Sequence, residues 1–195
     1  MIAEAVRRSA LADYADRFAA LSAATGGELS IRELPFVLQV NLRADPKDVG
    51  LMQRFGGALG FALPMAPNTV TSREDRRALW LCPDEWLVVG PAGQQEALEQ
   101  ALRNGFNGEF GSVVDVSANR TVLEIRGRKA RELLAHGVPI DLDARSFGPG
   151  RCAQTLMAKA QVTVERRNEE QAFHLHVRSS FASYLADWLL DAAAE

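Results

Sequence analysis

The feature that most constrains this fold is an order of elements that the sequence uses twice. A strand, a helix, a loop, a strand pair and a second helix are indicated between residues 34 and 103, and the same order returns between residues 122 and 192. Aligning Leu87–Pro91 with Leu175–Ser179 superposes the last strand and helix of both stretches. Units of this kind bury one face of a sheet under helices. We therefore predict an α+β protein of two similar strand–helix–loop–hairpin–helix halves with mostly antiparallel sheets, at about residues 31–110 and 111–195.

The elements of the first half follow from hydrophobic periodicity. Alternate apolar residues over 34–42 predict a strand with one buried face. Asp45 and Pro46 introduce a helix over 48–58, and a second helix is expected over 94–103. Between them, "ALWLCPDEWLVVG" predicts a hairpin that turns at Cys82–Glu85, because Pro and Asp suit a type I turn. The glycines of "FGGALG" at the end of the first helix are interpreted as a cap and not as a nucleotide-binding loop.

The second half shows the same elements in the same order. We expect a strand at "VLEIRG", a helix over 128–136 that ends at Gly137, a strand pair, and a last helix at "SFASYLADWLLDA". The strand pair is "QVTVERR" followed by "AFHLHVR".

An amphipathic helix is predicted ahead of both halves, from Ala3 to Ala24. Its apolar stripe consists of Leu11, Tyr14, Phe18 and Leu21, and Gly26-Gly27 ends it. The stripe either folds back on the domain or docks on another protein. We treat residues 1–30 as a docking segment and the stripe as an interface, so deletion of residues 1–24 is expected to weaken assembly more than it destabilises the isolated chain.

Composition excludes several classes of function. The net charge is −3 without a basic stripe, which argues against nucleic-acid binding. Apolar runs stay shorter than a membrane span needs, and the N-terminus does not read as a signal peptide. Cys82 and Cys152 are expected to be free thiols, so we predict a cytoplasmic protein.

Four segments together resemble the gamma subunit family of heterotetrameric sarcosine oxidase, which is related to the folate-binding aminomethyltransferase (glycine-cleavage T-protein) fold. They cover about residues 34–192 in the family's order: "LWLCPDEWLVVGP", "VVDVSANRTVLEIRG", "ARELLAHGVPIDLDARSFGPGRCAQT" and "SFASYLADWLLDA".

The resemblance implies a place in a complex that oxidises sarcosine to glycine. The methyl carbon passes to tetrahydrofolate or leaves as formaldehyde, and hydrogen peroxide is the other product. It implies alpha, beta and delta subunits as partners, which hold the FAD, FMN, NAD and tetrahydrofolate, and an accessory role for the chain itself. T-proteins present an aspartate to folate from a hairpin, but the corresponding "LMAKAQVTVERR" contains neither Asp nor Gly. Without that carboxylate, aminomethyl transfer has no evident acid or base here.

The turn "FGPGRCAQT" is the strongest candidate for a ligand-binding loop. Pro149 has no N–H to offer an anion, so we interpret the segment as a structural turn. Arg151 has a planar group that can hold a carboxylate of a neighbouring subunit, and we predict an interface role for it.

Other candidate sites receive structural interpretations. His174 and His176 point to one side of a strand and could hold a metal with a third ligand, but a polar or partner-facing sheet surface is favoured. The adjacent carboxylates Asp84 and Glu85 are assigned to a turn. Trp80, Trp86 and Trp188 are assigned to core or interface packing and not to a ring-stacking platform.

We therefore predict a non-catalytic assembly subunit with no metal, cofactor or catalytic residue assigned to it. The alternatives are a free-standing tetrahydrofolate-binding protein and a small aminomethyltransferase-like enzyme, for which no catalytic residue can be named.

Overall fold

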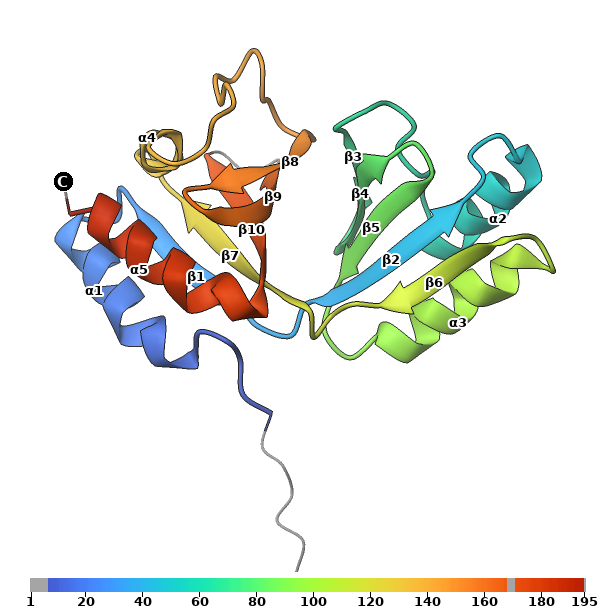
Figure 1. The fold of residues 1–195 in the computed structure, drawn as a ribbon, viewed down its shortest axis with the longest axis horizontal. Coiled ribbons are helices and arrows are strands. Elements are labelled where there is room, and N and C mark those ends of the chain that lie inside the picture. The colour runs from blue at the N-terminus through green and yellow to red at the C-terminus, as the bar shows by residue number, and fades with distance from the viewer. Residues whose placement is uncertain (1–6, 168–170, 195) are drawn as a thin grey trace, which may run out of the picture.

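The computed structural model describes residues 7–167 and 171–194, which fold into two lobes (Figure 1). Each lobe contains a five-stranded sheet in which every neighbouring pair is antiparallel, as the repeated order of elements predicts. Sheet A has the order β1 (Ser30–Leu34), β7 (Arg120–Arg126), β10 (Ala172–Arg178), β9 (Ala160–Arg166) and β8 (Cys152–Met157). Sheet B has the order β3 (Val70–Arg73), β4 (Arg76–Cys82), β5 (Glu85–Gly90), β2 (Leu38–Ala44) and β6 (Gly111–Asp115).

The lobes do not coincide with the predicted sequence halves, because each half gives one strand to the other lobe. Strand β1 pairs with β7 in sheet A, although it precedes all of sheet B in the sequence. Strand β6 pairs with β2 in sheet B, although it follows the first half. The boundary near residue 110 is therefore wrong, and two connections run between the lobes (Figure 1).

The single strand expected over 34–42 is two strands that belong to different sheets. Strand β1 ends at Leu34, and β2 begins at Leu38. Between them Pro35 cannot donate a ladder hydrogen bond, and Phe36 adopts a left-handed backbone with φ of 59°. Alternation continued through this break, which is why the sequence pattern concealed it.

Helices cover one face of each sheet. α2 (Val49–Leu59) and α3 (Gln95–Phe106) cover sheet B, while α1 (Ala15–Ala24), α4 (Ala130–Ala135) and α5 (Ala182–Ala192) pack against sheet A (Figure 1). Asp48 caps α2, because its side chain accepts a hydrogen bond from the Leu51 N–H at 2.8 Å. Gly60 ends the helix at φ of 84°, which confirms the predicted glycine cap.

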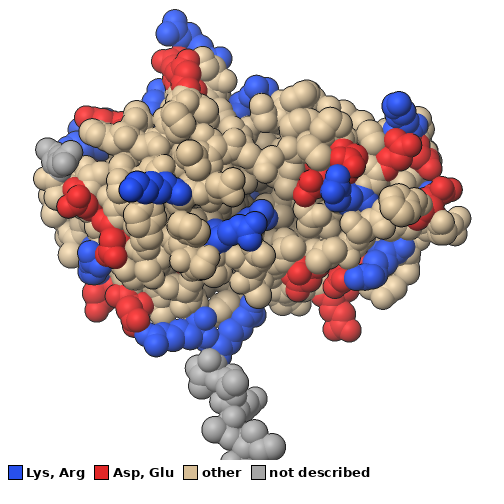
Figure 2. All heavy atoms as spheres, in the orientation of Figure 1, with Lys and Arg blue, Asp and Glu red and all other residues tan. Residues whose placement is uncertain are grey.

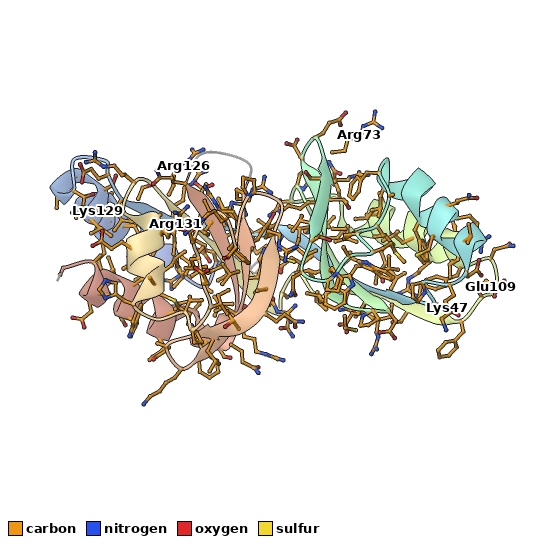
Figure 3. All side chains as sticks on the ribbon, turned by 90° about the horizontal axis from the view of Figure 1, so that it is seen from above. Lys47, Arg73, Glu109, Arg126, Lys129 and Arg131 are labelled. Carbon is orange, nitrogen blue, oxygen red and sulfur yellow. The ribbon has the colours of Figure 1, made fainter. Side chains whose placement is uncertain are left out.

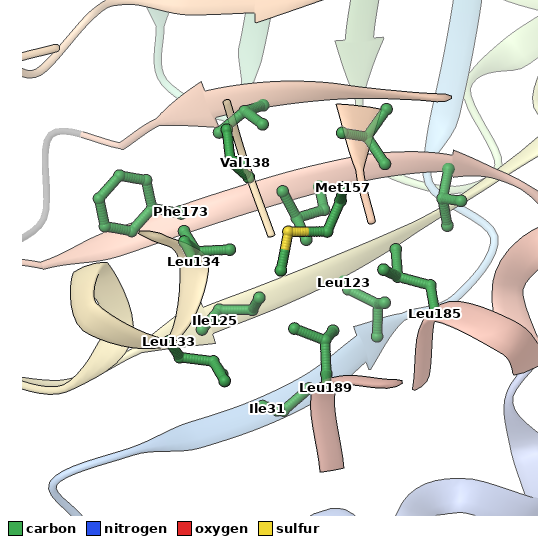
Figure 4. Packing of buried hydrophobic residues seen from close by; sticks show 14 of the residues in the cluster. Ile31, Leu123, Ile125, Leu133, Leu134, Val138, Met157, Phe173, Leu185 and Leu189 are labelled. Atoms are coloured by element: carbon green, nitrogen blue, oxygen red, sulfur yellow. The ribbon is translucent and has the colours of Figure 1, made fainter. Parts of the chain in front are cut away.

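Two hydrophobic cores lie between the helices and their sheets. In lobe A, side chains of α4 and α5 meet the sheet around Met157, as Figure 4 shows. In lobe B, Trp86 is fully buried, and its indole N–H donates to the Pro64 carbonyl at 2.8 Å. Trp188 lies partly buried at the edge of the lobe A core. Core packing is therefore confirmed for these two tryptophans.

The uncovered faces of the two sheets meet in the middle of the molecule. Sheet B contributes Leu79, Leu81, Leu87 and Val89, which pack with Cys152 of β8 in a third, smaller cluster. These inner faces carry the candidate site described next.

The N-terminal segment folds back on lobe A. Helix α1 follows a short 3-10 turn, η1 (Ala12–Tyr14), and so begins later than predicted; residues 1–6 lie outside the described part of the chain. Leu11 and Phe18 are 2% and 4% exposed within the lobe A core, and Tyr14 and Leu21 pack against it. Tyr14 and Arg17 also bind the Asp187 carboxylate of α5.

The predicted docking surface is therefore wrong for Leu11 and Phe18, because their own chain covers them. Of the two fates considered for the stripe, the structure shows the fold-back.

Candidate functional site: a charge network between the sheets

Six ionisable side chains form what we call the interlayer network; five are buried between the two sheets, and Arg32 lies at its exposed edge with a side chain that is 64% exposed. Strand alternation places them there, because the neighbouring apolar residues of the same strands point to the helices. The network consists of Arg32 on β1, Arg77 on β4, Glu124 on β7, Glu165 on β9, and His174 and His176 on β10.

Glu165 is the centre of the network. One carboxylate oxygen, Oε2, lies 2.9 Å from Arg77 Nε and 3.3 Å from His176 Nε2, while Oε1 accepts a hydrogen bond from Arg167 Nη1 at 2.7 Å. The Glu165 and Arg77 side chains are 1% and 9% exposed. An ion pair from sheet B to sheet A therefore stands in the interior of the molecule.

His174 extends the network across sheet A. Arg77 Nη2 lies 3.1 Å from His174 Nδ1, and His174 Nε2 lies 3.3 Å from Glu124 Oε2. The neutral tautomer with its proton on Nε2 satisfies both contacts, since Arg77 then donates and Glu124 accepts. Glu124 in turn accepts a hydrogen bond from Arg32 Nε at 2.6 Å.

The environment fixes the charges of these groups. Burial lowers the pKa of His174 and lowers that of His176 to about 4, although the Glu124 and Glu165 carboxylates act in the opposite direction. The hydrogen bond from His174 lowers the pKa of Glu124 to about 2, against the effect of burial. Burial would raise the pKa of Glu165, but Arg77 and the two histidines outweigh it and hold that pKa below its usual range. At neutral pH the network thus contains ionised carboxylates, arginines and neutral histidines.

This arrangement joins the sheets and does not suit metal binding. The Glu165 oxygen that both histidines approach is already paired with the Arg77 guanidinium, so a cation occupies the position a metal would take. No group of three or more His, Cys, Asp or Glu suited to a metal occurs in residues 7–167 and 171–194. The predicted polar surface around the histidines is also wrong, because they are 5% and 1% exposed.

Sequence reasoning missed the acid and the arginine of this network. Glu165 lies within the alternating strand segment "QVTVERR", and Arg77 immediately precedes the apolar segment "ALWLC", so neither was recognised as part of a site. The register of the predicted hairpin could have indicated the contact, because it places Glu165 directly opposite His174.

The turn at Gly148–Arg151 forms a hydrogen-bonded contact between the lobes, in addition to the interlayer network. The Gly150 carbonyl accepts from the Val70 N–H at 2.8 Å, and the Cys152 N–H donates to the Asn68 carbonyl at 3.0 Å. The N–H of Gly150 itself donates to Arg166 of β9 at 3.2 Å. With these donors bound to carbonyls, the turn does not form an anion cradle, and its structural interpretation is confirmed. Gly150 has φ of 75°, a conformation that favours glycine.

The predicted interface residues are not brought together. Arg151 is half-buried between the sheets, where its backbone forms an isolated antiparallel β-bridge with Thr69. The apolar stripe of the N-terminal segment lies on the outer side of sheet A. A contact between Arg151 and another subunit remains a prediction. Asp84 and Glu85 flank the β4–β5 turn as expected, and Asp84 pairs with Arg43 at 3.0 Å.

The space between the sheets does not fit a folate ring. Its centre is filled by the cluster of Leu79, Leu87 and Cys152 and by the interlayer network. A pterin placed there would have to displace the buried Arg77–Glu165 pair, which is costly. We therefore derive no chemical step through folate on this chain.

The two-lobed fold is that of the aminomethyltransferases. A crystal structure of the glycine cleavage system aminomethyltransferase T from Bartonella henselae matches with a TM-score of 0.62 and 17% identity, over 84% of this chain and 45% of that one. At this identity the likeness concerns the fold alone.

The particular family follows from closer relatives. The model of the "Sarcosine oxidase, gamma subunit family" matches residues 43–195. The sarcosine oxidase subunit gamma of Corynebacterium sp. (strain P-1) is 37% identical over 191 residues, 97% of this chain and 91% of that protein, and the Arthrobacter sp. subunit matches equally well. This chain belongs to the sarcosine oxidase gamma subunit family.

A solved structure agrees with this membership. A chain of the heterotetrameric sarcosine oxidase from Corynebacterium sp. U-96, in complex with pyrrole 2-carboxylate, has a TM-score of 0.87 and 35% identity, with 96% and 95% of the two chains covered. Within the described ranges, no helix has both the length and the apolar character to cross a bilayer.

Proposed function

We propose that this chain is the accessory gamma subunit of a heterotetrameric sarcosine oxidase, which oxidises sarcosine to glycine with hydrogen peroxide and formaldehyde or 5,10-methylenetetrahydrofolate as products. The observation that carries the proposal is the near-complete match, in sequence and in fold, to a chain of such an enzyme. Its partners are the alpha, beta and delta subunits, and its role is assembly and not catalysis. Cytoplasmic location is part of the proposal, supported by the free thiols Cys82 and Cys152.

The interlayer network supports the non-catalytic role. Glu165 and His174 are buried and bonded to Arg77, which joins the two sheets, and His174 is also bonded to Glu124 within sheet A, so these groups are engaged by other side chains of the chain itself. An acid or base that serves a substrate needs to be within hydrogen-bond reach of it.

An apolar surface on lobe B is suited to a partner subunit. Val49 and Met65 are 66% and 53% exposed, and they border a hollow of about 390 Å³ between α2 and the loop that follows it. Met52 and Phe61 also line it. Exposed apolar residues gathered in this way mark interaction sites. We name the surface formed by Val49, Met52, Phe61 and Met65 the α2 patch.

Charge on the rest of the surface is mixed. On the face shown in Figure 2, Lys and Arg side chains are interspersed with Asp and Glu. At the far end of lobe B, Figure 3 shows Lys47 and Glu109, which carry opposite charges. Such a surface supports a protein partner over a nucleic acid, which would call for a basic stripe.

The test is co-expression of the full chain with the alpha, beta and delta subunits, followed by size-exclusion chromatography. We expect all four chains to elute together, and a gamma chain that elutes alone would refute the subunit role. Calorimetric titration of the isolated chain with tetrahydrofolate tests the alternative; micromolar binding would favour a free-standing folate-binding protein.

A matched pair of variants tests the α2 patch separately. Val49→Asp is expected to reduce co-elution at least tenfold, whereas Val114→Asp, which changes a valine that is 49% exposed on β6, is expected to leave it unchanged. Equal effects of the two changes would reject the α2 patch while leaving the subunit role intact.

A further inference from the structure

A polar pocket lies at one end of the inner face of sheet A. It has a volume of about 380 Å³, and four strands contribute to its lining. The lining includes Arg120 of β7, Arg178 and His176 of β10, Gln161 and Thr163 of β9, and Gln154 of β8. We name it the arginine pocket.

Arg120 and Arg178 make this pocket unusual. They lie directly opposite each other on the neighbouring antiparallel strands β7 and β10. Side chains in such a pair lie close together on one face of a sheet, and like charges at these positions repel. The chain therefore contains a local electrostatic cost that its own fold does not explain.

The rest of the described chain does not neutralise the pair. Within residues 7–167 and 171–194, neither guanidinium forms a hydrogen bond or an ion pair, and Glu85 acts on Arg120 only from beyond ion-pair distance. Burial lowers the pKa of Arg120, and the charge of Arg178 lowers it further. The interlayer network next to the pocket shows the contrast, because there each arginine has a carboxylate at 2.6 to 2.9 Å.

The remaining lining groups suit an anion. Gln161 and Thr163 offer an amide and a hydroxyl, which donate hydrogen bonds. Arginine binds carboxylates through two parallel N–H···O bonds, and two opposed arginines can hold one carboxylate between them.

We propose that the arginine pocket binds a carboxylate group between Arg120 and Arg178. The carboxylate belongs either to a small free acid or to an acidic side chain of another subunit. The second source rests on the proposed function, whereas the first does not.

The first experiment uses the full chain alone, with sodium succinate as the probe. Labelled protein is titrated at constant ionic strength, and the arginine side-chain N–H resonances are followed by NMR. We expect saturable shifts at Arg120 and Arg178, and at least a tenfold weaker response in Arg178→Gln. Sodium chloride at the same ionic strength is the control for general screening.

The control variant is Arg126→Gln. Arg126 is an exposed arginine at the other end of β7, in lobe A (Figure 3). It is expected to bind succinate like the wild type. The melting temperature of Arg178→Gln should not fall below that of the wild type, because the change removes a repulsion; this separates loss of binding from loss of folding.

The second experiment measures assembly of the same variants with the partner subunits. A free acid as ligand predicts succinate binding by the isolated chain and normal assembly of Arg178→Gln. An acidic side chain as ligand predicts at least tenfold weaker assembly of Arg178→Gln but not of Arg126→Gln, with no saturable succinate shifts. If the isolated chain does not bind succinate and Arg178→Gln assembles like Arg126→Gln, the proposal is overturned.

Discussion

The inner faces of the two sheets share a topology but differ in chemistry. Sheet B presents mainly leucine and valine to the middle of the molecule, whereas sheet A presents Glu124, Glu165, His174 and His176. Arg77 and Gln39 of sheet B contact these groups, Arg77 through Glu165 and His174 and Gln39 through His176. Two units of one architecture are thus joined by an apolar cluster and an ion pair side by side. The cluster buries apolar surface, and we expect the ion pair to determine how the sheets meet.

The largest loss of stability is expected from Glu165→Gln. The change leaves Arg77 without its buried carboxylate and should lower the free energy of unfolding by about 3–5 kcal/mol, measured by urea denaturation. Asp187→Asn is the control, because it disrupts the Arg17–Asp187 pair, whose side chains are 54% and 55% exposed; we expect a loss below about 1 kcal/mol. Similar losses in both variants would show that the buried pair does not hold the sheets together.

Phe18→Ala tests how much the lobe A core contributes to stability, for comparison with the interlayer network. Phe18 is buried against lobe A, so its truncation should destabilise the isolated chain by about 3 kcal/mol. The expectation from the sequence was the reverse, namely that the N-terminal helix matters for assembly more than for stability. Normal stability of the free chain combined with poor assembly would restore that expectation.

Acidic pH should lower the free energy of unfolding through the interlayer network. Because the pKa of His176 falls from a usual value near 6.5 to about 4 on folding, the unfolded chain binds more protons between these values. The stabilisation is complete above pH 6.5 and decreases as the pH falls to 4, by on the order of 3 kcal/mol. His176→Gln should flatten the curve of unfolding free energy against pH in that window. An unchanged curve would assign the acid sensitivity to other groups.

The smallest expected effect concerns the turn between the lobes. Gly150→Ala places a side chain at φ of 75° and should cost about 1–2 kcal/mol in unfolding free energy. Gly57→Ala, in helix α2 with open space around the added carbon, should instead stabilise the chain by about 0.5–1 kcal/mol. Effects of the same sign would contradict the role given to the backbone at Gly150.

The fold was predictable where a local pattern determined it. The glycine cap at the C-terminal end of α2, the turn after Cys82 and the shared side of both histidines are confirmed, because capping, turn residues and strand alternation act within a few positions. The exchange of β1 and β6 and the burial of His174 were not predictable, because they depend on pairings between residues far apart in the sequence. The arginine pair likewise appears only when Arg120 and Arg178 become neighbours across two strands.

The exchange of strands between the lobes has a consequence for synthesis on the ribosome. Sheet B is complete once β6 has emerged, at Asp115, whereas β1 has no partner until β7 follows at residues 120–126. The N-terminal helix and β1, although made first, must therefore wait for the rest of lobe A. We therefore expect lobe B to form first on the growing chain, and the N-terminal residues to be among the last to reach their final place.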